Sequence, residues 1–136
     1  MVQLAIAAAL IASGVVIALV IRRRDGRAPA KGANWSVPVQ LHRADFDDPT
    51  APRLVVVFSS ATCDACAGTW ERVRALADAG TAVQQVSFQD QQKLHDRYGI
   101  DAVPTVVVAD AEGVVVASFV GPPSESELAE ALTAEG

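Results

Sequence analysis

Two cysteines, Cys63 and Cys66, are the residues of this chain whose type and spacing most directly suggest chemistry. They are the only cysteines among 136 residues, and the stretch SSATCDACAGTW places them three positions apart. A pair with this CxxC spacing can exchange a disulfide, form half of a metal site, or consist of two inert buried thiols. The sequence around the pair helps to choose among these three interpretations.

The position of the pair favours redox chemistry. A thiol attacks a disulfide only as its thiolate, and a free cysteine has a pKa of about 8.5. Cys63 follows the apolar run LVVVF and a short loop, and it opens a segment with a helical apolar period. Unpaired N–H groups and the helix dipole stabilise an anion there. Cys66 lies one turn further on, so that Cys63 can attack a substrate disulfide and Cys66 can resolve the mixed disulfide.

A metal site is the first alternative, and the available ligands argue against it. A closed zinc site would need two ligands besides the two cysteines. The chain has no further cysteine, and its two histidines, His42 and His95, show no metal-ligand spacing. We expect both histidines to be ordinary surface or loop residues, and we predict no metal and no cofactor. Two inert core thiols are disfavoured by the strand–loop–helix context.

The elements that position the cysteines follow from apolar patterns and turn residues. A continuous apolar run predicts a strand covered on both faces, and an apolar period of about 3.6 predicts an amphipathic helix. A capping box at Ser124 and Glu127 opens the last helix. The expected order is strand 37–41, strand 54–59, helix 63–79, strand 82–88, helix 90–98, strand 105–109, strand 114–120 and a final helix. The central strand–helix–strand unit requires a parallel pair, and the later hairpin adds antiparallel strands.

With these elements in order, the chain resembles the thioredoxin-like family over about residues 37 to 136. The likeness rests on LVVVFSSATCDAC, then YGIDAVPTVVV, then EGVVVASFVG before a helix. The resemblance implies an α/β thioredoxin-like fold with a central mixed β-sheet flanked by helices.

The resemblance also implies roles for individual residues. In this family the first cysteine of the motif is the exposed nucleophile and the second is the buried resolving thiol, which gives these roles to Cys63 and Cys66. A cis-proline facing the cysteines falls on Pro104. The backbone before that proline pairs with the substrate chain like an added strand. The expected substrate-binding residues are therefore Thr62, Val103 and Pro104.

The chain departs from the thioredoxin pattern at the groups that move protons. Thioredoxin reads W-C-G-P-C, whereas residues 62–66 read TCDAC, an opening more similar to membrane-tethered members of the family. The family's buried acid falls on Val57 and its basic partner near Gln85, and both are neutral. Asp64 places a carboxylate between the sulfurs, which should raise the pKa of the Cys63 thiol. We therefore expect a narrow substrate range or slow exchange.

The N-terminal stretch VQLAIAAALIASGVVIALVI, residues 2–21, is apolar all round. Twenty residues rising about 1.5 Å each could cross a hydrocarbon core of about 30 Å. We predict a transmembrane anchor at 1–21 rather than a cleaved signal, a basic flexible linker at 22–36, and the thioredoxin-like domain at 37–136. The basic flank favours a cell-membrane protein with its domain on the cytoplasmic side, with an extracytoplasmic domain as the alternative.

The distribution of charged residues along the chain limits the kinds of partner that it can bind. Five of the 11 basic residues fall between positions 22 and 31, so the chain after residue 32 has 6 basic and 15 acidic side chains, a formal charge of −9. Such a domain repels phosphate backbones, so we predict no nucleic-acid partner. The sequence thus predicts a membrane-anchored thiol–disulfide oxidoreductase acting on protein cysteines with an unidentified redox partner. A non-enzymatic module that binds a partner protein or a thiophilic metal is the alternative.

Overall fold

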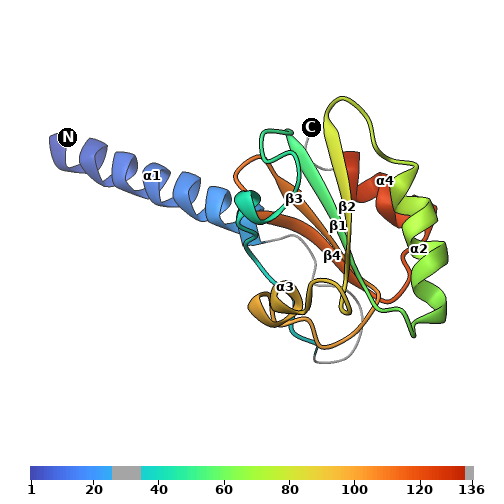
Figure 1. Ribbon diagram of the computed structural model, residues 1–136. Helices are drawn as coiled ribbons and strands as arrows, with labels where there is room; N and C mark the ends of the chain where they lie inside the picture. Colours follow the sequence, from blue (N-terminus) through green and yellow to red (C-terminus); the bar gives the residue numbers. More distant parts are fainter. Residues whose placement is uncertain (26–34, 134–136) are drawn as a thin grey trace.

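The computed structural model describes residues 1–25 and 35–133, without the side chains of residues 18–25. A four-stranded mixed sheet forms its centre, with helices on both faces (Figure 1). The strands lie in the order β2-β1-β3-β4. The elements are α1 (Val2–Asp25), the 3-10 helix η1 (Arg43–Asp45), β1 (Arg53–Ser59), α2 (Asp64–Arg74), β2 (Thr81–Ser87), α3 (Gln92–Arg97), β3 (Thr105–Asp110), β4 (Val115–Val120) and α4 (Glu125–Thr133).

The strand directions gather three chain segments at one edge of the sheet. Strand β1 pairs with β2 in parallel, with Ser59 opposite Ser87. It pairs with β3 in antiparallel fashion, with Phe58 opposite Thr105, and β3 pairs with β4 in the same way. The ends of β1 and β2 therefore lie beside the start of β3. The predicted parallel pair and the predicted closing hairpin are both confirmed.

Alternation along β1 divides the core into two layers. Val55 and Val57 point to the face covered by α2 and α4, where they pack with Val73 and Leu128. Leu54, Val56 and Phe58 point to the other face, where Leu94 of α3 packs against them. Because both faces are covered, every residue from Leu54 to Phe58 is fully buried. This explains the uninterrupted apolar run in the sequence.

The ends of several predicted elements differ from the structure. The segment predicted as strand 37–41 forms only an isolated bridge between Gln40 and Val114. Helix α2 ends at Arg74 rather than 79, because Asp78 and Thr81 exchange backbone hydrogen bonds in the turn into β2. The predicted capping box is confirmed: Ser124 N–H donates to Glu127 Oε2 at 2.8 Å, and Glu127 N–H donates to Ser124 Oγ at 3.2 Å.

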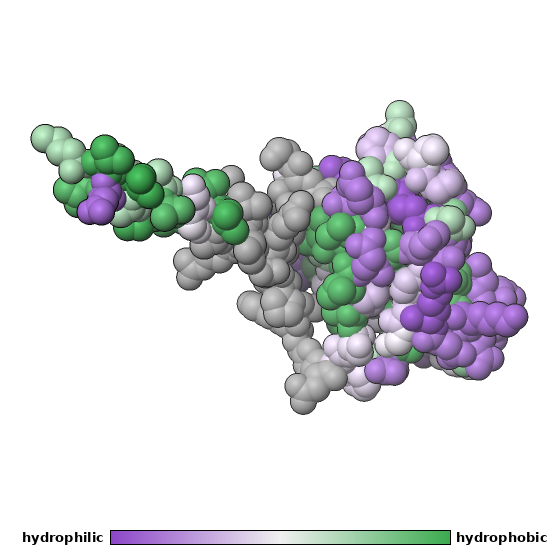
Figure 2. All heavy atoms as spheres, turned by 90° about the vertical axis from the view of Figure 1, so that its left-hand side faces the viewer, coloured by the Kyte–Doolittle hydropathy of each residue, from purple (hydrophilic) through white to green (hydrophobic). Residues whose placement is uncertain are grey.

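Helix α1 precedes the domain, and Figure 2 shows apolar side chains along it. Residues 1–17 of this segment are exposed. Among the residues whose side chains the structure describes, no helix is long and apolar enough to cross a membrane. The predicted localisation as a single-pass membrane protein is therefore wrong. Most of the predicted linker, 22–36, lies outside the described residues.

Candidate active site

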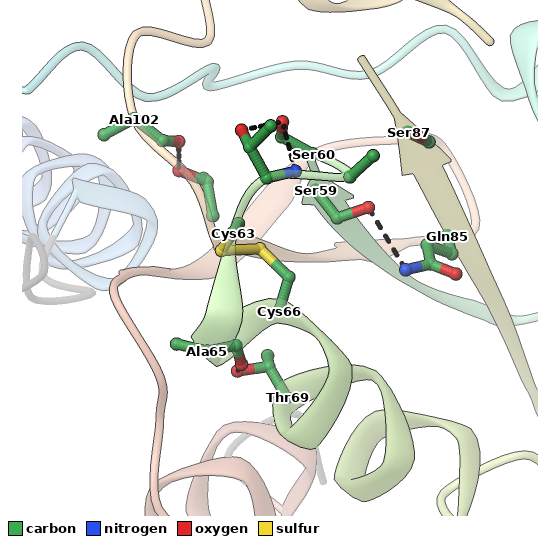
Figure 3. The surroundings of a disulfide bond; sticks show 12 residues. Ser59, Ser60, Cys63, Ala65, Cys66, Thr69, Gln85, Ser87 and Ala102 are labelled. Atoms are coloured by element: carbon green, nitrogen blue, oxygen red, sulfur yellow. Dashed lines mark hydrogen bonds between the residues drawn. A yellow bond between two sulfur atoms is a disulfide. The ribbon is translucent and has the colours of Figure 1, made fainter. Parts of the chain in front are cut away.

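Cys63 and Cys66 form a disulfide at the start of α2, with their Cα atoms 5.4 Å apart (Figure 3). Cys63 is the N-cap residue of the helix and has an extended backbone conformation. Its side chain is half-buried, whereas Cys66, one turn further on, is only 2% exposed. The structure thus brings the two predicted cysteines together and leaves only the first within reach of a large partner.

Local hydrogen bonds fix the start of the helix. The N–H of Cys63 donates to the carbonyl of Ser60 at 3.2 Å, and the N–H of Cys66 donates to the carbonyl of Cys63 at 3.3 Å. No side chain caps the helix at Cys63. No side-chain acceptor therefore competes with a thiolate for the first turn, whose N–H groups other than that of Cys66 can stabilise it. Asp64, which is exposed, adds a carboxylate beside this position.

A second loop lies beside the disulfide. The bond between Val103 and Pro104 is cis, as predicted. Thr105 Oγ1 donates to the carbonyl of Ala102 at 2.7 Å, and Figure 3 draws Ala102 among the residues around the sulfurs. Within the described residues, the backbone of Val103 forms no hydrogen bond. Its N–H and carbonyl are therefore available to another chain.

The groups behind the buried sulfur are neutral. Val57, where the family resemblance places an acid, is fully buried. Gln85 Nε2 donates to Ser59 Oγ at 3.1 Å, and Figure 3 shows this pair near Cys66. Ser59 is only 2% exposed. The hydroxyl of Ser59 and the amide of Gln85 are thus the polar groups in this region, where other members of the family have an acid and a base. No carboxylate among these residues could take the proton of the resolving thiol.

The two histidines have different environments. His42 is exposed, as expected. His95 is only 2% exposed: its Nε2 lies 2.9 Å from the carbonyl of Val86, and its ring packs edge-on against Phe58 and Phe88. The expectation of a surface or loop residue is therefore wrong for His95, which faces the sheet from α3. Among the described residues, no three His, Cys, Asp or Glu side chains lie together as a metal site would require.

Contacts between distant segments were not visible in the sequence. Thr62 is exposed in the loop before Cys63, with its Oγ1 3.1 Å from Ser60 Oγ. The side chain of Gln89 reaches this loop from the turn after β2, where it contacts Ser60 and Ala61. Gln89 is one of three glutamines in the polar stretch QDQQK, so no local pattern distinguishes it. Only the parallel pairing of β1 with β2 brings the two turns together.

Comparison with solved structures identifies thioredoxins as similar folds. A mutant thioredoxin from Halobacterium salinarum NRC-1 is 25% identical, covers 71% of this chain and 89% of its own, and superposes with a TM-score of 0.54. Thioredoxin from Fasciola hepatica is 26% identical over 64% of this chain and 84% of its own, with a TM-score of 0.55. The short form of thioredoxin F from spinach chloroplast, 17% identical, matches in fold over 77% of this chain and 99% of its own, with a TM-score of 0.56.

A comparison with curated proteins gives no match. The family profile described as a thioredoxin-like domain matches residues 48–135. That range contains the disulfide, the cis-proline and all four strands of the sheet. The chain therefore belongs to the thioredoxin-like family.

Proposed function

We propose that this protein is a thiol–disulfide oxidoreductase that exchanges disulfides with the cysteines of other proteins. The observation that carries the proposal is the disulfide at the start of α2, in which Cys63 is half-buried and Cys66 is 2% exposed. A thioredoxin-like fold with a cysteine pair at disulfide distance fits this chemistry. The difference in exposure supports a first attack by Cys63 and a second by Cys66.

The reaction follows from this assignment. In the reduced protein, the Cys63 thiolate attacks one sulfur of a substrate disulfide, forming a mixed disulfide and releasing the other sulfur as a thiolate. The Cys66 thiolate then attacks Cys63 Sγ, which forms the intramolecular disulfide and releases the second substrate thiolate. Two electrons pass to the substrate, and a separate redox partner restores the dithiol. The reverse sequence would oxidise a substrate dithiol.

Substrate binding is proposed to use Thr62, Val103 and Pro104. The unpaired N–H and carbonyl of Val103 support this, because an extended peptide can add to them as a strand adds to a sheet edge. Thr62 is exposed directly before the reactive cysteine. We assign these residues to a domain spanning 37–136, of which the family match covers 48–135.

Substitution of each cysteine tests the mechanism. Cys63→Ser should abolish reduction of a protein disulfide, because the attacking sulfur is lost. Cys66→Ser should instead accumulate a mixed disulfide with substrate, because the resolving sulfur is lost. Thiol-trapping gel electrophoresis and an insulin-reduction assay would measure both. Retention of wild-type disulfide reduction by the Cys63→Ser protein would refute the proposal.

The second candidate function is a non-enzymatic binding module for a partner protein or a thiophilic metal. The neutral surroundings of Cys66, with Val57 fully buried and Ser59 bonded to Gln85, favour it, because they offer no built-in base. A redox titration distinguishes the two functions. A pair that remains oxidised at every physiological potential would support the binding module, whereas reversible cycling would support the oxidoreductase.

A further inference from the structure

Gln89 stands on a turn that is firmly attached to the end of the sheet. The N–H of Phe88 donates to the carbonyl of Ser59 at 2.8 Å, which continues the pairing of β1 with β2 by one residue. The carbonyl of Ser87 accepts from Asp90 N–H at 3.2 Å and from Gln91 N–H at 2.9 Å, and these bonds close the turn. The backbone that carries Gln89 is therefore fixed to the strand from which the cysteine loop departs.

The side-chain amide of Gln89 bonds in both directions across the gap between the two turns. Its Oε1 accepts the N–H of Ala61 at 2.9 Å and the hydroxyl of Ser87 at 3.2 Å. Its Nε2 donates to Ser60 Oγ at 3.2 Å. One amide thus engages two successive residues of the loop that leads to the reactive cysteine.

Ser60 carries these contacts on to Cys63. Its Oγ accepts the N–H of Thr62 at 3.4 Å, and its carbonyl accepts the N–H of Cys63 at 3.2 Å. Each bond restricts the loop just before the N-cap position. The result is a continuous path of hydrogen bonds from Gln89 through Ser60 to the residue that bears the attacking sulfur.

We propose that Gln89 is a positioning residue that holds loop 60–62 so that the Cys63 sulfur stays at the start of α2. The inference rests on the proposed function only in taking Cys63 as the attacking thiol. A loop released from Gln89 would sample more backbone conformations, and the thiolate would spend less time near the N–H groups that stabilise it. The amide is needed because it accepts from Ala61 and donates to Ser60 at once, which neither a carboxylate nor an apolar side chain can do.

The test compares two glutamines in the full-length chain carrying Cys66→Ala, so that Cys63 is the single thiol. Gln89→Met removes the loop contacts. Gln84→Met is the matched control, because Gln84 Oε1 accepts one backbone N–H, that of Asp47 at 2.8 Å, away from the cysteine loop. The readout is the alkylation rate of Cys63 by iodoacetamide as a function of pH. We expect Gln89→Met to shift the profile to higher pH and to lower the rate at pH 6 about three- to tenfold. The loss of about one hydrogen bond from a backbone N–H to the Cys63 thiolate would have an effect of this size.

Ser60→Ala separates positioning from a general loss of structure. If Gln89 acts through Ser60, the double variant Gln89→Met with Ser60→Ala should shift the profile by less than the sum of the two single shifts. The shifts caused by Ser60→Ala and by Gln84→Met should simply add. An unchanged midpoint in Gln89→Met, or an equal shift in Gln84→Met, would overturn the inference. Because alkylation needs no substrate protein, this result is independent of the disulfide-reduction assay. If the wild-type protein fails the disulfide-reduction assay, but Gln89→Met still shifts the alkylation profile of Cys63, only the proposed function is overturned.

Discussion

Two segments of this domain are held in place by long polar side chains, and the two side chains differ in burial. The segment at η1 is held by Arg43, which is only 8% exposed. The guanidinium donates to the carbonyls of Ala51 at 2.9 Å, Asp110 at 3.0 Å and Asp48 at 3.1 Å. The loop before Cys63 is held by Gln89, which is exposed. Hydrogen bonds from a long polar side chain therefore hold the buried segment at η1. Similar hydrogen bonds hold the exposed loop before Cys63, where the reactive sulfur stays accessible.

Burial changes how much such a hydrogen bond contributes to the stability of the fold. A buried charged donor that satisfies backbone carbonyls contributes more to stability than an exposed amide, because its loss leaves those carbonyls unpaired away from water. Arg43 Nε itself has no hydrogen-bond partner among the described residues, so the cation is not fully satisfied. An exposed contact such as that of Gln89 adds little stability, and its expected effect is on the position of Cys63.

The largest expected effect is that of Arg43→Met on stability. The substitution keeps most of the apolar stem but leaves three carbonyls without their donor, so the free energy of unfolding should fall by about 3 kcal/mol. Urea denaturation would measure the change. Arg74→Met is the control, since Arg74 forms an exposed ion pair with Glu71 at 2.9 Å and should cost less than about 1 kcal/mol. Equal losses in the two variants would remove the distinction between buried and exposed contacts.

A smaller effect is expected from Tyr98, which binds the same η1 segment from the end of α3. Burial, and then the hydrogen bond donated to Asp45, raise the pKa of Tyr98 above its usual value. The neutral phenol is thus favoured by the folded state. Its contribution to stability is complete below pH of about 10 and is lost as pH rises through the folded-state pKa.

Because Tyr98 is the only tyrosine, its ionisation can be followed directly by ultraviolet absorbance. The midpoint should lie above about 10 in the folded protein and near 10 in urea. Tyr98→Phe should lower the free energy of unfolding by about 1 kcal/mol at pH 8 and should weaken its decline at alkaline pH. A folded-state midpoint at or below that of the unfolded chain would contradict the expectation.

The smallest expected effect is that of Asp64→Asn, at the first residue of α2 and next to Cys63. Removing the exposed carboxylate next to Cys63 should lower the pKa of its thiol, because the thiolate no longer faces a like charge. The alkylation rate of Cys63 at pH 7 should rise about two- to threefold at low salt and less at high salt. Asp96→Asn, an equal charge change on the exposed surface of α3, is the control. A similar increase in both variants would show that net charge alone is responsible.

The parts of the fold that local sequence determines were predictable. The run LVVVF predicted the central strand because a strand covered on both faces needs apolar residues throughout. Ser124 and Glu127 predicted the start of α4 because their reciprocal hydrogen bonds involve only neighbouring residues. The CxxC spacing and the proline at 104 predicted the disulfide and the cis bond through family resemblance.

The contacts that depend on tertiary structure were not predictable. A charge on Arg43 gave no indication of burial, because its partners are carbonyls of the turn at Asp48 and Ala51 and of Asp110, which is distant in sequence. His95 lies in a short polar helix, and only the packing of α3 on Phe58 and Phe88 buries it. Gln89 meets Ser60 because β1 and β2 end side by side. The membrane localisation, predicted from the apolar run 2–21 and its basic flank, is also contradicted by the described residues.

The order of the strands has a consequence for synthesis of the chain. Strand β3 begins directly after Pro104 and lies next to β1, yet it follows both cysteines in sequence. A growing polypeptide therefore emerges from the ribosome with both thiols before the strand that will flank them has been made. We expect the early chain to be able to close its disulfide without the surface that selects a partner. Discrimination among partners would then arise only after β3 has been made.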